Sequence, residues 1–426
     1  MCSLLTRCWV VHKVTNTVHS LRFSQGAPLA MKVVSGFRAV RRPAPDPRRV
    51  LIVSQATVDG VAVCVRDLVA AAITKGYRPT VACPPGGDLA PWARECDATW
   101  ARLDMRRSPH PTDLQAVLRL RSLSRGHALV HLHSAKAGAV GRLALMSLGR
   151  NRPPSVFTPH GWSWLVGGWL APVYRRFERL MMPVTTAVVA VSAEERMDGQ
   201  AVLGASAARI QVIPNGVDLA RFRPEGPRAE RTADPLVVFV GRLCHQRAPD
   251  LAVTALSLMR TPGAQLRLVG TGQDRRAVVA QARALGLSDR VELVGFHPDP
   301  APDLRAADVV IVPSRYDGMA LVLLEAMACG AAVVATRVAG SSALGEAGVL
   351  VPAENPQALA RAVDGLLADP DRRRLLGLAA HQRAAKLYSL NRSLDAILAL
   401  WQDLGARPAS GRSVRRSNGQ NAWQGK

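Results

Sequence analysis

The chain has 426 residues, of which 48% are hydrophobic and 20% charged, a balance typical of globular proteins and not of disordered ones. This length predicts two or three domains, and no apolar run reaches the roughly 18 residues that a membrane-spanning helix needs. The formal net charge is +23, of which residues 1–49 carry +8 and residues 407–426 carry +5. The excess of positive charge at the two ends is the only feature that favours nucleic-acid binding, and the sequence contains no recognisable nucleic-acid-binding module.

The two ends, residues 1–48 and 406–426, are basic and rich in Pro, Ser, Gly and Arg, a composition typical of disordered tails. Arg7, His12 and Lys13 interrupt the apolar runs near the N-terminus, so we expect no signal peptide and a cytoplasmic protein. The seven cysteines form no CxxC pair and no regular spacing, which predicts reduced thiols and no zinc site.

From residue 49 the chain alternates short apolar runs with segments of helical spacing. A strand over 48–55 is followed by a helix over 61–77 that stops after a glycine, and then by a second strand over 78–87. Three further apolar runs cover 126–134, 154–161 and 185–192. Such runs, rich in Val and Leu and separated by helices, predict a parallel sheet buried on both faces, in a first domain over 49–222.

A charged segment without periodicity, residues 223–235, predicts a linker to a second series of the same kind. Its strands are expected at 235–242, 265–272, 291–296, 308–314 and 331–337, in a domain over 236–386. One more amphipathic helix covers 387–405. The fold class is therefore α/β, with two tandem doubly wound domains and a ligand cleft between the carboxyl ends of their strands.

The stretch SRYDGMALVLLEAMACG, residues 314–330, holds one acid beside a glycine and a second among leucines. We expect a helix from Met319, which separates the α-carbons of Asp317 and Glu325 by about 12 Å. Glycosidase carboxylates that act on one bond lie at roughly 5–9.5 Å, so these acids are expected to hold different parts of an extended ligand, with an anion at the helix start. Two alternatives stay open: Glu325 as the ion-pair partner of an arginine, and Asp317 as a helix N-cap.

Two arginines follow the strand-end glycine Gly241. Arg242 comes directly after it and Arg247 lies further along the same loop, and two guanidinium groups at a strand end can hold phosphate oxygens bidentately. Either arginine alone is more often a solvated surface charge. The Gly-x-Gly turn at 270–272 lacks the full dinucleotide fingerprint and is weak by itself.

Histidines end two strands of the first half. His160, which precedes a glycine, is the better active-site candidate, although strand-end histidines are more often structural. His131 and His133 share one strand face, but without a third ligand they do not predict a metal site. The DPD motif at 369–371 lies between two helical segments, and a helix-capping role is expected for it.

Four segments in order resemble the retaining glycosyltransferases of family 4, which have the two-domain GT-B fold. They are VIPNGVDLARFRP (212–224), VFVGRL (238–243), LRLVGTGQD (266–274) and the long stretch 314–340, and the resemblance spans roughly residues 49–405. The pair HSAKAGAVGR and FTPHGW, at 133–142 and 157–162, is similar to a branch that acts in bacterial exopolysaccharide and capsule assembly.

The resemblance implies a role for each acid. Glu325 matches the acid that hydrogen-bonds the nucleotide ribose, and Asp317 matches the acid beside the hydroxyls of the donor sugar. The backbone of the intervening residues would line the sugar and the diphosphate, at Gly318, Met319, Ala320 and Leu321.

The resemblance also assigns the diphosphate. Arg242 and Arg247, with Gly241 before them, match the basic pair that neutralises the leaving group, so no metal and no cofactor is implied beyond a UDP- or GDP-linked donor sugar. Gly60 matches a glycine whose amide approaches the β-phosphate, and His160 a histidine that contacts the donor sugar. Gly295 and Phe296 fall where the backbone of the family holds the base.

The sequence departs from the family pattern at a few of these positions. Asp317 replaces the usual Glu, Met319 and Ala320 replace Phe and Gly, and Arg247 replaces Lys. Asp59 stands where the first glycine of a Gly-Gly pair is usual. No carboxylate nucleophile is obvious, which fits the front-face mechanism proposed for the family, in which the leaving phosphate takes the acceptor proton.

Residues 161–182 indicate the kind of acceptor, and they hold three of the eight tryptophans. Helical spacing places Val173, Phe177, Leu180 and Met181 on one face, with Arg175, Arg176 and Arg179 elsewhere. A basic amphipathic surface of this kind suits the inner face of the cell membrane and a lipid-linked acceptor. The equal alternative is that the apolar face packs on the first sheet.

The leading functional prediction is an enzyme that moves a sugar to a saccharide or lipid-linked acceptor, in exopolysaccharide, capsule or other cell-envelope glycan synthesis. The alternative is a catalytically weak GT-B protein that binds nucleotide sugar or polysaccharide as an assembly partner. The departures at Asp59, Asp317 and Ala320 motivate this alternative. The sequence predicts neither the sugar, the base and the linkage nor the oligomeric state.

Overall fold

The computed structural model describes residues 45–165 and 168–409, so the predicted tails lie almost wholly outside the described residues. The first half forms a seven-stranded parallel sheet in the order β3-β2-β1-β4-β5-β6-β7. Its strands are β1 (Arg49–Ser54), β2 (Arg78–Cys83), β3 (Thr99–Arg102), β4 (Leu129–His133), β5 (Ser155–Thr158), β6 (Ala187–Ala190) and β7 (Ile210–Val212).

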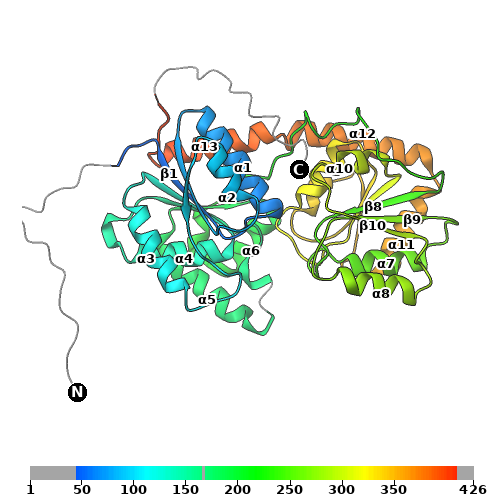
Figure 1. The fold of residues 1–426 in the computed structure, drawn as a ribbon, viewed down its shortest axis with the longest axis horizontal. Helices are drawn as coiled ribbons and strands as arrows, with labels where there is room; N and C mark the ends of the chain where they lie inside the picture. The colour runs from blue at the N-terminus through cyan, green and yellow to red at the C-terminus, as the bar shows by residue number, and fades with distance from the viewer. Residues whose placement is uncertain (1–44, 166–167, 410–426) are drawn as a thin grey trace, which may run out of the picture. The chain divides into compact units, whose positions relative to one another are not determined.

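Helices cover both faces of this sheet (Figure 1). One face packs against α1 (Asp59–Thr74), α2 (Leu89–Glu95) and α13 (Leu390–Asp403). The other packs against α3 (Asp113–Ser124), α4 (Ala135–Met146), α5 (Ala171–Met181) and α6 (Ala193–Leu203). Burial on both faces explains why the central strands read as unbroken apolar runs.

The second half repeats this arrangement around a six-stranded parallel sheet in the order β10-β9-β8-β11-β12-β13. Its strands are β8 (Leu236–Val240), β9 (Gln265–Val269), β10 (Val291–Gly295), β11 (Val309–Val312), β12 (Val333–Thr336) and β13 (Val349–Val351). One face carries α7 (Pro249–Leu258), α8 (Arg275–Ala284) and α11 (Pro356–Leu367). The other carries α9 (Ala301–Ala306), α10 (Leu321–Ala328) and α12 (Pro370–Leu387).

The predicted fold class is confirmed, but three strands were not predicted: β3, β7 and β13. All three are edge strands of three or four residues. Their residues are partly exposed, with only one buried side chain in each strand. Because an edge strand is covered less completely than a central one, its sequence lacks the long apolar run that makes central strands recognisable.

The C-terminal helix, expected after the second domain, returns to the first sheet. Trp401 of α13 is fully buried among side chains of β1, α1 and β4. Its indole Nε1–H donates to His131 Nδ1 at 3.2 Å. The chain stays attached beyond this helix, because Ala406 is buried and the amide of Arg407 donates to the carbonyl of Pro47.

The chain passes between the two sheets twice, and the two crossings lie side by side. Val217 pairs with Ser389 in an isolated parallel bridge, with hydrogen bonds from Val217 N to Tyr388 O and from Leu390 N to Val217 O. A Cβ atom on Gly216 would lie 2.5 Å from the Cα of Leu390, so only glycine fits at this contact.

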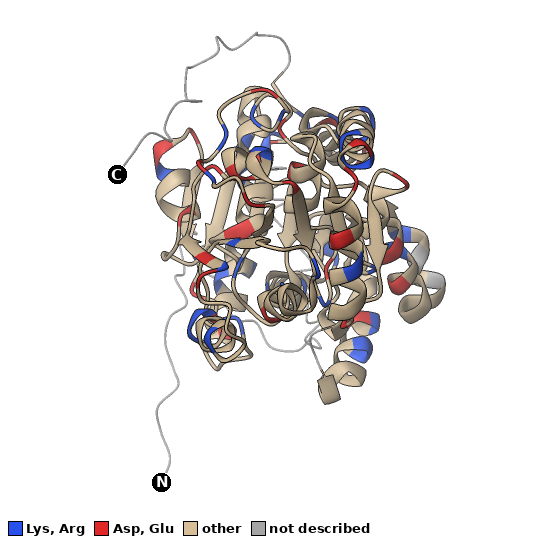
Figure 2. Ribbon diagram, turned by 90° about the vertical axis from the view of Figure 1, so that its right-hand side faces the viewer, with Lys and Arg blue, Asp and Glu red and all other residues tan. Residues whose placement is uncertain are grey.

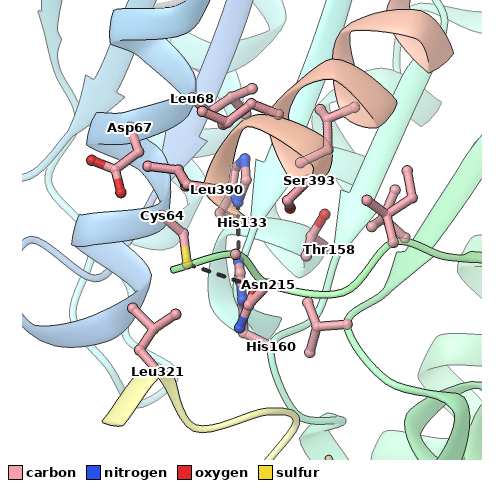
Figure 3. Close-up of a pocket in the computed structure, with 16 residues that line it drawn as sticks. Cys64, Asp67, Leu68, His133, Thr158, His160, Asn215, Leu321, Leu390 and Ser393 are labelled. Atoms are coloured by element: carbon pink, nitrogen blue, oxygen red, sulfur yellow. Dashed lines mark hydrogen bonds between the residues drawn. The ribbon is translucent and has the colours of Figure 1, made fainter. Parts of the chain in front are cut away.

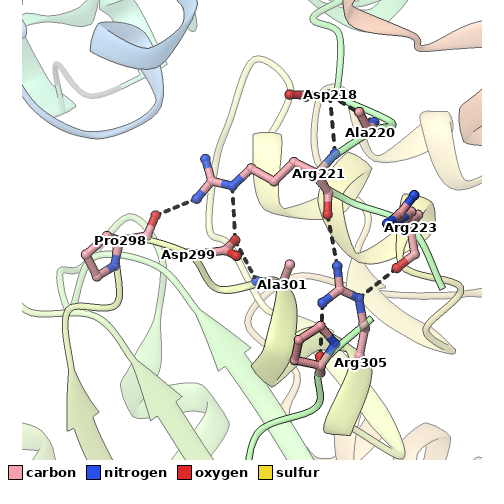
Figure 4. A network of polar contacts seen from close by, with 9 residues as sticks. Asp218, Ala220, Arg221, Arg223, Pro298, Asp299, Ala301 and Arg305 are labelled. Carbon is pink, nitrogen blue, oxygen red and sulfur yellow. Dashed lines mark hydrogen bonds and ion pairs between the residues drawn. The ribbon is translucent and has the colours of Figure 1, made fainter. Parts of the chain in front are cut away.

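The segment after the first crossing is fixed to the second half by two arginines (Figure 4). Arg221 donates through Nε to Asp299 at 3.0 Å and also bonds the carbonyl of Pro298. Arg305 of α9 donates to three carbonyls of this segment, those of Arg221, Arg223 and Pro227. The start of the predicted linker is therefore held against the second sheet's loops by side chains.

Charged residues lie mainly on helices and loops, and the strands carry few of them (Figure 2). No helix within residues 45–165 or 168–409 combines the length and apolarity needed to cross a membrane. Asp369 caps α12 by accepting a hydrogen bond from Arg372 N, which confirms the capping role predicted for the DPD motif.

Candidate functional site

Four loops at the carboxyl ends of strands form the candidate site. They follow β1, β5, β8 and β11. These loops and the helices that begin after them hold the acids, arginines and histidine that the sequence singled out. In doubly wound sheets this edge is where ligands bind.

Asp317 and Arg247 meet directly in this site. Arg247 Nη1 forms an ion pair with the Asp317 carboxylate, whose other oxygen accepts the amide of Gly318 at 2.9 Å. Asp317 is only 7% exposed, and removing Arg247 would leave its buried carboxylate without an ion-pair partner. The N-cap alternative for Asp317 is wrong, because α10 begins later, at Leu321, and its N-cap position is Ala320.

The loop between Asp317 and α10 is closely packed. A Cβ atom on Gly318 would lie 2.9 Å from Gly161 N and 3.1 Å from the carbonyl carbon of His160, so this position requires glycine. Ala320 has an ordinary φ of −65°, which explains why alanine fits where the family usually has glycine.

Asn215, which the sequence analysis did not single out, ties this loop to the first crossing. Its side-chain amide donates to Met319 O at 3.0 Å. Its place in the VIPNGVD motif was the signal that could have identified it.

Glu325 lies one turn into α10, nearer to the helix start than the sequence predicted, because the helix begins at Leu321 and not at Met319. The side chain is half-buried, and no donor within the described residues hydrogen-bonds or ion-pairs with its carboxylate. Burial raises its pKa from 4.5 to about 7. The alternative of a structural ion pair is therefore not supported, and the carboxylate is free to accept bonds from a ligand.

Arg242 forms an ion pair with Asp59, at 3.2 Å between Nη1 and Oδ2. The two residues come from different halves of the chain, since Arg242 follows β8 and Asp59 begins α1. Gly60 comes directly after Asp59, and a Cβ atom there would make only an ordinary 3.6 Å contact with Leu321.

The glycines around β8, β9 and β10 allow backbone segments to touch. Gly241 N donates to Val269 O at 2.9 Å, and a Cβ atom on Gly270 would lie 2.0 Å from the carbonyl oxygen of Gly241. The Gly-x-Gly turn is therefore needed for loop packing. Gly295 has a φ of +84°, and the next residue, Phe296, is 61% exposed. An exposed aromatic ring beside an open glycine backbone can stack on a flat ligand.

His160 belongs to a buried chain of imidazoles (Figure 3). Its Nε2 lies 3.1 Å from His133 Nδ1, and the ring of His133 packs on that of His131 with centroids 4.1 Å apart. Trp401 can only donate, so His131 Nδ1 accepts and His131 Nε2 carries the proton that it gives to Thr158 Oγ1 at 2.9 Å. Burial lowers the pKa of His160 to about 4 and that of His131 to about 3, so all three rings are neutral at pH 7.

His133 and His160 line a pocket between α1, α13 and the first crossing. Cys64 and Asp67 contribute from α1 and Ser393 from α13 (Figure 3). His133 Nε2 is buried and has no hydrogen-bond partner among the described residues. No group of three metal-ligating side chains occurs within the described ranges, and the imidazole chain is a hydrogen-bonded support for His160.

Glu195 holds the His160 loop from behind, and the sequence analysis missed it. Its carboxylate accepts the amides of Gly161 and Val191, at 2.5 and 2.6 Å, while its backbone carbonyl accepts Trp162 Nε1. Burial raises its pKa to about 7. The signal was Ser192, three residues earlier, which caps α6 and marks the start of a helix.

The tryptophan-rich segment divides between core and surface. Trp162 and Trp164 are buried and stacked at 4.6 Å, whereas Trp169 is 87% exposed. The apolar face expected on α5 is also divided, because Met181 is buried while Val173 and Leu180 are exposed. Its buried side is completed by Glu178, which pairs with the equally buried Arg142 at 2.7 Å.

Comparison with known proteins identifies the family. Residues 58–221 match the model of glycosyltransferase family 4, and residues 234–369 match that of the glycosyl transferases group 1. The D-inositol 3-phosphate glycosyltransferase of Nocardia farcinica is 36% identical over 327 residues, covering 68% of this chain and 71% of that protein. The enzyme of the same name from Rhodococcus erythropolis is 33% identical over 303 residues, covering 64% of this chain and 67% of that protein.

Solved structures of GT-B proteins share the fold. Anabaena HepE in complex with UDP and glucose superposes with a TM-score of 0.72 at 20% identity, covering 83% of this chain and 99% of that chain. Sucrose-phosphate synthase of Thermosynechococcus elongatus superposes with a TM-score of 0.71 at 24% identity, covering 84% and 98%. The family matches cover the second sheet and the first sheet except β1, and they include the loops after β5, β8 and β11. The chain therefore belongs to the group 1 glycosyltransferases of family 4, which use nucleotide sugars.

Proposed function

We propose that this chain transfers a sugar from a nucleoside diphosphate donor to a saccharide or lipid-linked acceptor, with retention at the anomeric carbon and without a metal ion. The observation that carries the proposal is the meeting of Arg242, Arg247 and Asp317 with the His160 loop at the strand ends. It supports the proposal because the arginines suit a diphosphate and the opposite loop carries only neutral groups.

In this mechanism the diphosphate leaves as the bond to the sugar breaks, and negative charge grows on its terminal oxygens. The guanidinium groups of Arg242 and Arg247 and the free amides at the start of α10 stabilise this charge in place. Asp317 fixes Arg247 through their ion pair and lies beside the sugar. Fixed positive groups of this kind supply the stabilisation that other transferases take from a metal ion.

Retention is proposed from the resemblance to the retaining enzymes of family 4. The front-face route is proposed because neither buried acid of the site is free to attack the sugar. Asp317 is paired with Arg247, and both carboxylate oxygens of Glu195 accept backbone amides. A double displacement through a carboxylate therefore lacks its nucleophile. In a front-face reaction the leaving phosphate oxygen takes the proton of the acceptor hydroxyl while that hydroxyl attacks from the same side.

The donor proposal is tested by thermal shift and turnover over a panel of UDP-, GDP- and ADP-sugars. We expect one donor class to raise the melting temperature and to support transfer or slow hydrolysis. Binding without either reaction would instead support the catalytically weak assembly partner. Retention is checked by the anomeric configuration of the product, by NMR.

Substitutions of Glu325 and Asp317 distinguish nucleotide binding from turnover. We expect Glu325→Ala to weaken nucleotide binding and Asp317→Ala mainly to lower turnover, because one lies at the ribose and the other at the sugar and Arg247. Unchanged nucleotide affinity in Glu325→Ala would overturn the ribose assignment.

For the acceptor, we propose a role in exopolysaccharide, capsule or cell-envelope glycan synthesis. A second candidate, favoured by the names of the relatives, is transfer to an inositol phosphate. Offering D-inositol 3-phosphate and lipid-linked saccharides as acceptors to the same donor distinguishes the two, since product forms with only one class.

A peripheral contact with the inner face of the membrane is part of this proposal. Trp169, Val173 and Leu180 are exposed at 87%, 59% and 66%, beside the exposed Arg175 and Arg176. An exposed tryptophan directly before a helix with exposed arginines suits an anionic bilayer surface. Flotation of residues 45–409 with anionic vesicles tests it: binding lost in Trp169→Ser supports the contact, and absence of wild-type binding rejects it.

A further inference from the structure

Asp59 occupies an unusual place for an acid. It is the first residue of α1, it has a φ of +63°, and it stands directly before Gly60. Glycine adopts this left-handed conformation without cost, whereas an aspartate only tolerates it. The carboxylate is nonetheless directed to Arg242 in the other half of the chain, with 3.2 Å between Oδ2 and Nη1.

Arg242 is not saturated by this contact. Its Nε is buried and has no hydrogen-bond partner in residues 45–165 or 168–409. The guanidinium is 34% exposed and the Asp59 side chain 45% exposed, so solvent and small anions reach the pair. The start of α1 adds backbone N–H groups without intrahelical partners. The position of Asp59 is thus one that stabilises an anion, and the Asp59 carboxylate is an anion that belongs to the chain itself.

We propose that Asp59 is a specificity-determining residue that competes with the diphosphate for Arg242 and thereby favours the sugar-linked donor over the free nucleoside diphosphate. The inference rests on the proposed function, because it needs the donor diphosphate at Arg242. The pair must open or rearrange when the diphosphate binds, and the Asp59 carboxylate then stays close to the terminal phosphate.

The discrimination follows from charge. In the donor the terminal phosphate is a diester and carries one negative charge, whereas in the free nucleoside diphosphate it approaches two. A nearby carboxylate repels the second more strongly than the first. Asp59 therefore weakens binding of the product more than binding of the donor, and it helps the product to leave.

The test compares Asp59→Asn and Asp59→Gly with the wild-type chain by calorimetric titration. The ligands are the nucleoside diphosphate that gives the largest thermal shift, its sugar-linked form and the corresponding nucleoside monophosphate. We expect both variants to bind the diphosphate about threefold to tenfold more tightly, the sugar-linked form by a smaller factor, and the monophosphate without change. Turnover in both variants is expected to show stronger inhibition by the diphosphate product.

Asp88→Asn serves as the matched control, because Asp88 is an exposed acid of the same half that forms no ion pair among the described residues. It should leave all three affinities unchanged. Asp59→Asn keeps the size of the side chain, so its result stands even if the glycine variant alters the loop.

Equal affinities for the diphosphate in wild type and Asp59→Asn would overturn the inference, as would the same tightening for the monophosphate. If Arg242→Ala abolishes diphosphate binding while the Asp59 variants change nothing, this inference fails and the proposed function stands. If no nucleoside diphosphate binds the wild-type chain, both fail.

Discussion

The two sides of the candidate site use different chemistry. The second half contributes four charged side chains, Arg242, Arg247, Asp317 and Glu325, and the first three form ion pairs. The first half contributes Asp59, which pairs with Arg242, and the His160 loop, held by neutral imidazoles and by the buried Glu195. One side is suited to a diphosphate and the other to an uncharged sugar.

The difference shows how one cleft can treat the two ends of a donor separately. On the diphosphate side the charged groups form ion pairs, because an unpaired buried charge has a large desolvation free energy. On the sugar side burial instead removes the charge, by lowering the pKa of His160 to about 4. The predictions that follow test whether the two sides behave independently.

The largest effect is expected from the diphosphate side. Arg247→Ala should lower kcat by about 10²–10³-fold, because it removes a fixed charge from the leaving group and leaves Asp317 buried without its partner. Steady-state kinetics with the identified donor measures this. Arg276→Ala, at an exposed position of α8, is the control and should be silent. A loss below tenfold in Arg247→Ala would separate Arg247 from the reaction.

The second-largest effect on kcat is expected from the contact between the two sides of the site. Gly318→Ala places a Cβ atom 2.9 Å from Gly161 N, so the loops must move apart, and we expect kcat to fall by about 10²-fold. Gly60→Ala meets nothing closer than 3.6 Å and should keep the wild-type melting temperature. If Gly318→Ala is fully active, the contact between the His160 loop and Gly318 is not needed for catalysis.

Glu325 should make donor binding depend on pH. Burial raises its pKa to about 7, and the ribose requires the carboxylate, so the Kd of the sugar nucleotide should fall as the pH rises from 6 to 8, by up to about tenfold per pH unit below the pKa. Glu325→Gln should bind weakly at every pH. The same shift makes the contribution of Glu325 to the free energy of unfolding decrease as the pH rises from 4.5 to about 7, because the folded chain keeps a proton on Glu325 that the unfolded chain has lost.

The smallest effect is expected from the histidine support. His133→Phe should lower kcat by about threefold to tenfold without changing nucleotide affinity, because it removes only the partner that orients His160. His127→Phe, which breaks the buried 2.9 Å bond to Thr80 away from the site, should lower the melting temperature but not kcat. Equal kcat in wild type and His133→Phe would remove His133 from the mechanism.

The same histidines affect how the free energy of unfolding depends on pH below neutrality. The pKa of His160 falls from 6.5 to about 4 in the folded chain, so at this residue the unfolded chain binds more protons in this window. The contribution of His160 to the free energy of unfolding therefore rises between about pH 4 and pH 6.5, opposite in sign to that of Glu325. Urea titrations at several pH values measure the slope. His160→Phe should make the slope of the free energy of unfolding against pH less positive in this window, and an unchanged slope would contradict burial of a neutral His160.

The sequence pointed to the charged residues of the candidate site and to His160, and it missed the residues that support them. Arg242, Arg247, Asp317 and Glu325 lie in short motifs, each next to a strand end or a helix start that local pattern predicts. Glu195 and Asn215 act through backbone groups far away in the chain, Gly161 and Met319, and no local pattern marks such partners.

The sequence by itself determined the α/β class, the two sheets, the family and the charged residues, because burial on both faces and strand-end glycines leave local patterns. Only the tertiary structure decided which groups are paired. It joined Asp59 to Arg242, stacked His133 on His131 below His160, and returned α13 to the first sheet. These contacts join residues far apart in the chain, and their energy depends on burial and distance, which exist only after the two sheets have formed.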